Sequence, residues 1–216
     1  MIFLRYESFR GYLKQYPVTS AIIAANLIYF IIVAIAGSTE NAMHLLRYGA
    51  FYAEPGLDDY GLMEPYRYIS SMFMHSGVQH LLFNMFALLV FAPPLERLTG
   101  HVRYAFFYLL CGVAANFASA FMTVQLDRPY VLSVGASGAI YGVYGAYLFL
   151  AVFRKSWLDA GSRKTVYMIL ASGLIYSFLI PTINVWAHIG GGVAGFLLFG
   201  LFDRLMTRKR RFGRHY

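Results

Sequence analysis

Long apolar stretches alternate with short clusters of charged residues along the whole chain. A helix needs about 20 mostly apolar residues to cross a bilayer, because the hydrocarbon core is about 30 Å thick and a helix rises about 1.5 Å per residue. Charge-poor windows predict six transmembrane helices, near residues 18–37, 79–93, 104–124, 136–153, 165–180 and 186–203. The pattern therefore indicates an all-α, polytopic membrane protein in which residues 1–216 form a single membrane domain.

The last two predicted helices come from one uncharged stretch, residues 165–202, which is too long for a single crossing. Proline cannot continue a helix interior, and it disfavours helix in the residue before it. We therefore expect one helix to end before Pro181 and the next to begin after Asn184.

Composition also favours a membrane location. Charged residues make up 13% of the chain and hydrophobic residues 59%, whereas soluble domains carry about 25% charged residues. The net charge of +8 would suit a nucleic-acid partner if the basic residues were gathered on one polar module. They lie instead in short runs between apolar segments, so the lipid bilayer is the expected partner and nucleic acid is not.

The distribution of basic residues predicts the orientation in the membrane. The segments before the first helix, between the second and third, between the fourth and fifth, and after the sixth hold 15 of the 18 Lys and Arg residues. The opposite loops hold only Arg47, Arg67 and Arg128. Because cytoplasmic loops are enriched in Lys and Arg, we expect both termini in the cytoplasm. The short chain, without a transit-like N-terminus or a seventh span, favours a bacterial plasma membrane.

The first outer loop, residues 38–74, is too long to be a simple connection. It is rich in aromatic residues and is interrupted by glycine and proline. Loops of this length usually cover or gate a site, or are disordered. The aromatic content predicts that the loop lies partly in the membrane interface.

Four polar residues stand out inside the predicted spans, where polar groups are costly and therefore suggest function. They are His80, Asn84, Ser137 and His188, and each lies near the start of a helix that enters from the outer side. Three separate stretches of sequence thus bring polar groups to a similar depth. We interpret this convergence as a site.

Glycine stripes predict which of these residues meet. Small residues on one helix face let another backbone approach closely. The stripes follow Ser137 on one helix and His188 on another, at Gly138, Gly142, Gly145, Gly191, Gly192 and Gly195. Packing of these two helices would place Ser137 and His188 within hydrogen-bonding reach.

Such a pair suits nucleophilic catalysis, because serine becomes a good nucleophile when an imidazole takes its proton. Apart from Asp203 at the last position of the sixth, beside a loop, the predicted spans contain no Asp or Glu, so a Ser–His dyad is expected in place of a triad. Tyr141, four residues after Ser137, could pack beneath the imidazole and orient it. His80 and Asn84, also four apart, are suited to donate hydrogen bonds to an oxyanion, together with the Ser137 backbone N–H.

Three stretches resemble the signature sequences of the rhomboid intramembrane serine proteases. They are Gly-Ala-Ser-Gly at 135–138, His-Ile-Gly-Gly-Gly-Val-Ala-Gly at 188–195 and His-Leu-Leu-Phe-Asn at 80–84. Their order and their placement on the second, fourth and sixth predicted helices make the resemblance specific.

The resemblance implies that Ser137 is the nucleophile and His188 the general base, with His80 and Asn84 stabilising the oxyanion and Gly135 and Gly138 supporting the site. It implies substrates that are single-span membrane proteins, which would enter near Phe83 and be cut near the outer face at a small residue. It implies no metal and no cofactor. His75 falls where the family often has another histidine, and Tyr66-Arg67 falls where many bacterial members have Trp-Arg.

Other interpretations remain beside this one. Asn84 could join helices through hydrogen bonds instead of serving an oxyanion. The chain could be a non-catalytic rhomboid-like protein that binds transmembrane clients, although such relatives typically lack the serine or the histidine. A His-Glu-x-x-His metalloprotease motif is absent. A zinc site of His75, His80 and His188 lacks ligand spacing.

Overall fold

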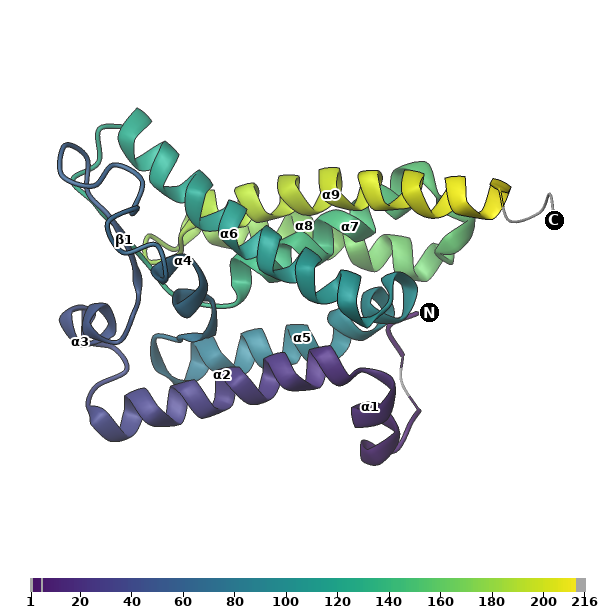
Figure 1. Ribbon diagram of the computed structural model, residues 1–216, viewed down its shortest axis with the longest axis horizontal. Coiled ribbons are helices and arrows are strands. Elements are labelled where there is room, and N and C mark those ends of the chain that lie inside the picture. The colour runs from purple at the N-terminus through teal and green to yellow at the C-terminus, as the bar shows by residue number, and fades with distance from the viewer. Residues whose placement is uncertain (1, 5, 213–216) are drawn as a thin grey trace.

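The computed structural model describes residues 2–4 and 6–212, with side chains through residue 205. The described part is mainly a bundle of helices that run roughly side by side (Figure 1). The α-helices are α1 (Phe9–Gln15), α2 (Pro17–Ala36), α3 (Ala42–Arg47), α4 (Arg67–Ser70), α5 (Gly77–Thr99), α6 (His101–Gln125), α7 (Ser137–Phe153), α8 (Ala160–Leu179) and α9 (Val185–Phe212). Two 3₁₀ helices, η1 (Ser71–Phe73) and η2 (Lys155–Trp157), and two strands, β1 (Phe51–Ala53) and β2 (Val131–Ser133), complete the order.

The helices that follow the predicted spans differ in how well they suit a membrane crossing. Among the described residues, four helices are long and apolar enough to cross: α2, α5, α6 and α9. The helix α7 is apolar but has only 17 residues, and α8 carries Arg163 and Lys164 near its start. The crossing of the membrane by α7 and α8, and so the count of six, stays a prediction.

The expected break at Pro181 is present. The helix α8 ends at Leu179 and α9 begins at Val185. Asn184 caps the new helix, because its side-chain oxygen accepts a hydrogen bond from the Ala187 N–H at 3.2 Å. The polar break therefore starts α9 just ahead of His188.

The helix α5 is longer than predicted, because it continues through Pro93 and Pro94 to Thr99. Pro93 has no N–H to donate to the carbonyl of Leu89, which would ordinarily weaken the helix. The hydroxyl of Tyr12 donates to that carbonyl at 3.4 Å and replaces the missing partner. The expected end near residue 93 was therefore wrong, and the error hid an acidic residue within the helix.

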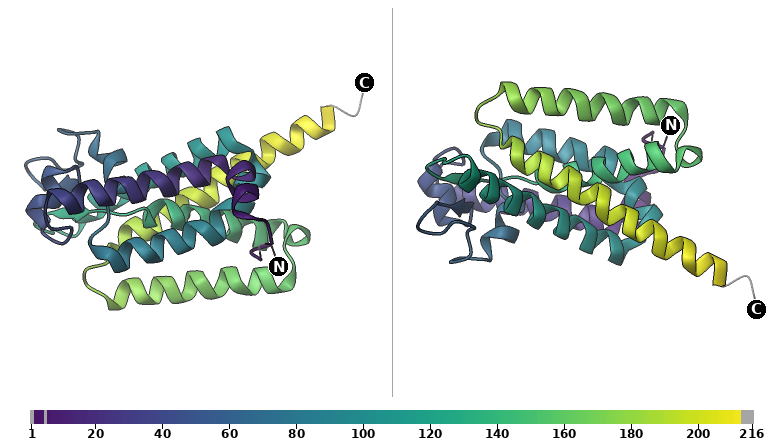
Figure 2. Two further views of the ribbon diagram at one scale, coloured as in Figure 1. Left: turned by 90° about the horizontal axis from the view of Figure 1, so that it is seen from below. Right: turned by 90° about the horizontal axis from the view of Figure 1, so that it is seen from above.

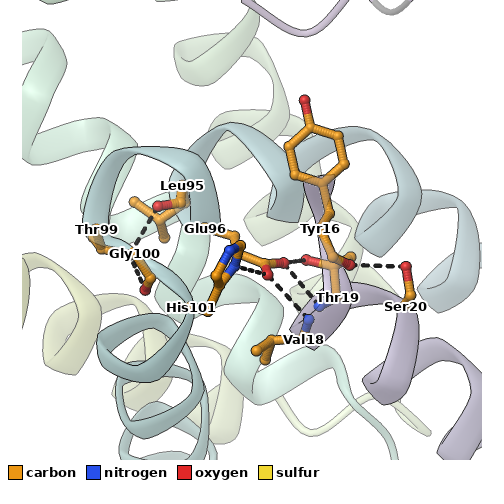
Figure 3. Close-up of polar contacts among 9 residues, drawn as sticks. All are labelled: Tyr16, Val18, Thr19, Ser20, Leu95, Glu96, Thr99, Gly100 and His101. Atoms are coloured by element: carbon orange, nitrogen blue, oxygen red, sulfur yellow. Dashed lines mark hydrogen bonds and ion pairs between the residues drawn. The ribbon is translucent and has the colours of Figure 1, made fainter. Parts of the chain in front are cut away.

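That residue, Glu96, is fully buried at the start of α2 (Figure 3). Its carboxylate accepts hydrogen bonds from the N–H groups of Val18 and Thr19 at 3.0 and 2.8 Å, and from the Thr19 hydroxyl at 2.6 Å. His101 Nδ1 lies 2.7 Å from the same carboxylate. A helix N-terminus leaves N–H groups without partners, so a buried carboxylate fits there.

The expectation that no acid lies within a helix span was thus wrong. It also failed for Asp203, which was expected beside a loop at the end of the sixth span, because α9 continues past it to Phe212. Asp203 is buried and receives bonds from Arg154 Nε and Nη2, the shortest at 2.6 Å. Both acids have cationic or hydrogen-bonding partners, and Ser137 is not among the described partners of either.

A small sheet was not expected from an all-helical pattern. The strands β1 and β2 pair antiparallel, with Phe51 opposite Ser133 and Ala53 opposite Val131. Three-residue strands are too short to give a periodic signal in the sequence. The pairing joins the first outer loop to the segment that leads into α7.

The first outer loop is ordered and is held by Arg67. This side chain is buried, and its Nη1 donates to the carbonyls of Leu46 and Ala50 at 2.5 and 2.9 Å. Its Nε donates to Glu64 at 2.8 Å, and this hydrogen bond lowers the pKa of Glu64 below its usual value. The arginine of the Tyr66-Arg67 pair therefore fixes the loop at one end of the bundle.

We call the end of the bundle that holds α3 and β1 the loop end. The helix α1 and the last turns of α9 lie at the opposite end (Figure 1). In both views of Figure 2, α8 runs along one edge of the bundle, apart from α2 and α6.

Candidate active site

Ser137 is the first residue of α7 and stands at the loop end, directly after β2 and a glycine turn. Gly135 has a φ of +121°, which residues with a β-carbon rarely adopt. Its N–H donates to the carbonyl of Ser71 at 2.9 Å, which fixes the turn against the first outer loop. The turn thus sets the place at which Ser137 enters the bundle.

The hydroxyl of Ser137 meets the imidazole of His188. Ser137 Oγ lies 2.9 Å from His188 Nε2, although the two residues are 51 positions apart in the sequence. His188 is 8% exposed, whereas Ser137 is partly accessible. The contact that the glycine stripes predicted is therefore present.

The backbones of α7 and α9 touch, and this closeness makes the contact feasible. A β-carbon on Gly191 would overlap the carbonyl oxygen of Gly138, and one on Gly195 would overlap that of Gly142. On its other side, Gly138 faces Ala115 of α6, whose β-carbon would lie 2.5 Å from an added one. The small residues thus let α7 pack closely against both α6 and α9.

Tyr141 lies beneath the imidazole. The two rings are stacked, with centroids 4.1 Å apart and planes inclined by 9°. Tyr141 is 7% exposed and therefore part of the buried wall of the site. Its placement matches the packing that the sequence predicted.

The second imidazole nitrogen has a partner that the sequence analysis missed. His188 Nδ1 lies 2.7 Å from Ser177 Oγ on α8. Ser177 falls inside the predicted span 165–180, close to the end of the span that leads to His188. That position could have suggested that Ser177 lies near the site. A serine in an apolar helix usually bonds only its own backbone, and this common role gave no reason to single it out.

His80 reaches the same turn from α5. A β-carbon on Gly135 would lie 2.7 Å from His80 Cε1 and 2.8 Å from Nε2, so the imidazole edge lies against the turn that precedes Ser137. The same hypothetical atom would be 3.7 Å from Ser137 Oγ. Gly135 therefore permits both the turn and the approach of His80.

Asn84 lies one helical turn after His80 on α5, and its side chain is 5% exposed. Its Nδ2 donates to the backbone carbonyl of His80 at 2.8 Å. One of its two amide hydrogens is thus bonded to its own helix, and no partner is described for the other.

His75 precedes the first residue of α5 by two positions, and its side chain is buried, at 2% exposure. Its ring meets that of His80 edge to face, with centroids 5.0 Å apart. Both ring nitrogens are buried without a hydrogen-bond partner among the described residues. Among the residues that the structure describes, the ring contact of His75 is thus with His80, and not with Ser137.

The candidate site contains the hydroxyl of Ser137, the imidazole of His188 that can accept its proton, and nearby N–H donors. This is the set that acyl transfer through a serine requires. The described contacts join Ser137, Tyr141, Ser177 and His188 directly, and they join His80 to the site through Gly135.

Comparison with known proteins agrees with the motifs. The sequence profile described as the Rhomboid domain matches residues 62–204. The chain is 34% identical to the candidate rhomboid protease YdcA of Bacillus subtilis over 98% of this chain and 100% of the relative. It is 32% identical to the rhomboid protease GluP of the same species over 82% of this chain and 33% of the relative.

The similarity extends to inactive proteins. The chain is 35% identical to inactive rhomboid protein 1 of Bos taurus, over 67% of this chain and 17% of that relative. Similarity alone therefore leaves the choice between a catalytic and a non-catalytic protein to the residues of the site.

Proposed function

Because the chain belongs to the rhomboid family, we propose that it is an intramembrane serine endopeptidase that cleaves single-span membrane proteins near the outer membrane face. The observation that carries the proposal is the 2.9 Å contact between Ser137 Oγ and His188 Nε2. The distance suits proton transfer between a nucleophile and a general base.

In the proposed reaction, His188 takes the proton of Ser137 as Oγ attacks the carbonyl carbon of the scissile peptide. The tetrahedral intermediate then collapses, the peptide C–N bond breaks, and the imidazolium gives its proton to the leaving amine. Water next attacks the acyl-enzyme ester with His188 again acting as base. The carboxylic product leaves, and the proton returns to Ser137.

The developing oxyanion needs hydrogen-bond donors that are already in place. The proposal assigns this role to His80, Asn84 and the Ser137 backbone N–H. The approach of His80 to Gly135 supports the first assignment. The second amide hydrogen of Asn84, which has no partner among the described residues, supports the second assignment, whereas the bond to the His80 carbonyl fits the alternative role in helix packing.

The proposed placement in the membrane follows from charge and architecture. The chain is a multi-pass membrane protein, and we place its six helices across a bacterial plasma membrane with both termini in the cytoplasm. The loop end, which carries Ser137, then faces outward. Water for deacylation would enter from that end.

A transmembrane substrate would approach through the lipid-facing side of α5, where Phe83 is 63% exposed. A helix hides its peptide carbonyls in hydrogen bonds, so the substrate must unwind locally before attack. Substrates with Gly or Pro near the cleavage point should therefore be cut faster.

The second candidate function is that of a non-catalytic protein that binds transmembrane clients. It is favoured by the similarity to inactive rhomboid protein 1. The presence of both Ser137 and His188 at bonding distance favours the enzyme instead.

The test is cleavage of a single-span substrate by the purified protein in liposomes. We expect cleavage by wild type, and none by Ser137→Ala or His188→Ala, although both variants insert and fold. Ser172→Ala serves as control, because Ser172 is exposed on α8 and its described hydrogen bonds go to its own helix. Cleavage by either purified site variant would refute the dyad, and a folded wild type that binds the substrate without cutting it would favour the second function.

A further inference from the structure

Ser177 holds the imidazole nitrogen that faces away from Ser137. Its Oγ lies 2.7 Å from His188 Nδ1, 2.6 Å from the Gly173 carbonyl oxygen and 3.5 Å from the Tyr141 hydroxyl. We propose that Ser177 is a positioning residue that fixes His188 in the tautomer whose Nε2 is free to accept the Ser137 proton. This inference rests on the proposed protease function.

The assignment follows from counting hydrogens. A serine hydroxyl has one proton to donate and two lone pairs, whereas a carbonyl oxygen can only accept. The bond to Gly173 therefore uses the Ser177 proton. The oxygen of Ser177 must then accept from His188, so the imidazole proton is on Nδ1.

The position of the imidazole proton decides whether Ser137 Oγ faces a lone pair or an N–H group. A neutral imidazole carries one N–H, and with that proton on Nδ1 the lone pair of Nε2 points at Ser137 Oγ. In the opposite tautomer the N–H would face the nucleophile and could not remove its proton. When His188 becomes an imidazolium, Nδ1 still donates to Ser177, so the contact serves both protonation states.

A hydroxyl suits this position better than a carboxylate does. In soluble serine proteases a buried aspartate holds the imidazole in the required tautomer. A charged carboxylate at membrane depth is costly. Ser177 supplies a neutral oxygen, and the carbonyl of Gly173 orients it by taking its proton.

The arrangement depends on the close approach of α8 to α7. A β-carbon on Gly173 would overlap the Tyr141 hydroxyl, so this glycine lets the two helices meet beside His188. Ser177 is one of three buried residues on α8, with Ser162 and Val166. The helix itself runs along the edge of the bundle (Figure 2). The orientation of the base is thus set by a helix that carries neither dyad residue.

The chain offers a matched control. Ser172 lies on the same helix and donates to the Met168 carbonyl at 2.7 Å, as Ser177 donates to Gly173. Ser172 is exposed, and its described bonds go to its own helix. Replacement of either serine by alanine removes one such helix bond, but only Ser177→Ala removes the partner of His188 Nδ1.

The kinetic test compares Ser177→Ala, Ser177→Thr and Ser172→Ala in liposomes with a single-span substrate. An unpaired buried donor is costly, so we expect Ser177→Ala to lower kcat by about tenfold to a hundredfold with little change in KM. Ser177→Thr keeps the hydroxyl and should recover most of the rate, and Ser172→Ala should match wild type. Wild-type kcat in folded Ser177→Ala would overturn the proposal.

A second measurement does not depend on turnover. In protein labelled with ¹⁵N-histidine, the His188 signals can be assigned by their loss in His188→Gln. We expect a protonated Nδ1 and an unprotonated Nε2 in wild type and Ser172→Ala, and a mixture of tautomers in Ser177→Ala. An unchanged tautomer in Ser177→Ala would overturn the positioning role, whereas absence of cleavage by wild type would refute only the proposed function.

Discussion

The imidazole of His188 lies almost parallel to the phenol ring of Tyr141, with a centroid separation of 4.1 Å. Tyr141 follows Ser137 by four residues on α7, so both project from the same face of that helix. One helix thus carries the proposed nucleophile and the surface on which the proposed base rests. This relationship fixes the imidazole plane without a charged group.

Loss of that surface should slow catalysis. We expect Tyr141→Ala to lower kcat by about tenfold, because ring pairs contribute about 0.5–1.5 kcal/mol and the imidazole would gain freedom to rotate. Tyr141→Phe keeps the ring and should stay within about threefold of wild type. Steady-state cleavage in liposomes measures both. Equal rates for Tyr141→Ala and wild type would show that the stacking does not orient the base.

Mutation can distinguish oxyanion stabilisation by His80 and Asn84 from a role of Asn84 in helix packing. Removal of one such donor typically lowers kcat by about 10²–10³-fold, so His80→Ala and Asn84→Ala should each do so with little change in KM. The melting temperature distinguishes the alternative for Asn84. A lower melting temperature with unchanged kcat in Asn84→Ala would assign this residue to helix packing.

Gly135→Ala should impair activity through two effects, the positive φ and the contact with His80. Gly56 is the matched control, because its φ is +84° but an added β-carbon meets no atom within 4 Å. Gly56→Ala should therefore show backbone strain alone, on the order of 1 kcal/mol in the free energy of unfolding. We expect Gly135→Ala to lower kcat and Gly56→Ala to leave it unchanged. If both variants cleave at the wild-type rate, the turn does not set the site geometry.

The buried Glu96 should contribute to stability and not to chemistry. Glu96→Gln replaces an acceptor of several N–H and O–H bonds by a group that is itself partly a donor. We expect the free energy of unfolding to fall by about 2–4 kcal/mol, with the rate per folded molecule unchanged. Denaturant unfolding in detergent measures the first quantity. Glu40→Gln, an exposed acid of the first outer loop, should be neutral; equal stabilities of the two variants would refute the role of Glu96.

The sequence predicted the positions of the long helices because lipid demands continuous apolar stretches. It failed at α5, where a helix continues through Pro93 because Tyr12 supplies a hydrogen bond from elsewhere. It also missed the pairing of β1 with β2, since three-residue strands are decided by the loops that bring them together. These features depend on tertiary contacts that no local pattern encodes.

For the site, the sequence predicted the contact of Ser137 with His188 and the place of Tyr141, since glycine stripes and helical spacing are local patterns. The contact of Ser177 was not predictable in the same way. It comes from a third helix, and its residue type is common in apolar helices. The catalytic roles themselves remain predictions that chemistry must test.

The most direct test of the account is labelling with a serine-directed fluorophosphonate, followed by mass spectrometry of the adduct. We predict that the wild-type protein is labelled on Ser137, that Ser137→Ala is not labelled, and that His188→Ala is labelled far more slowly. Labelling of folded Ser137→Ala equal to that of wild type, or an adduct on another serine, would contradict the assignment of Ser137 as the activated nucleophile.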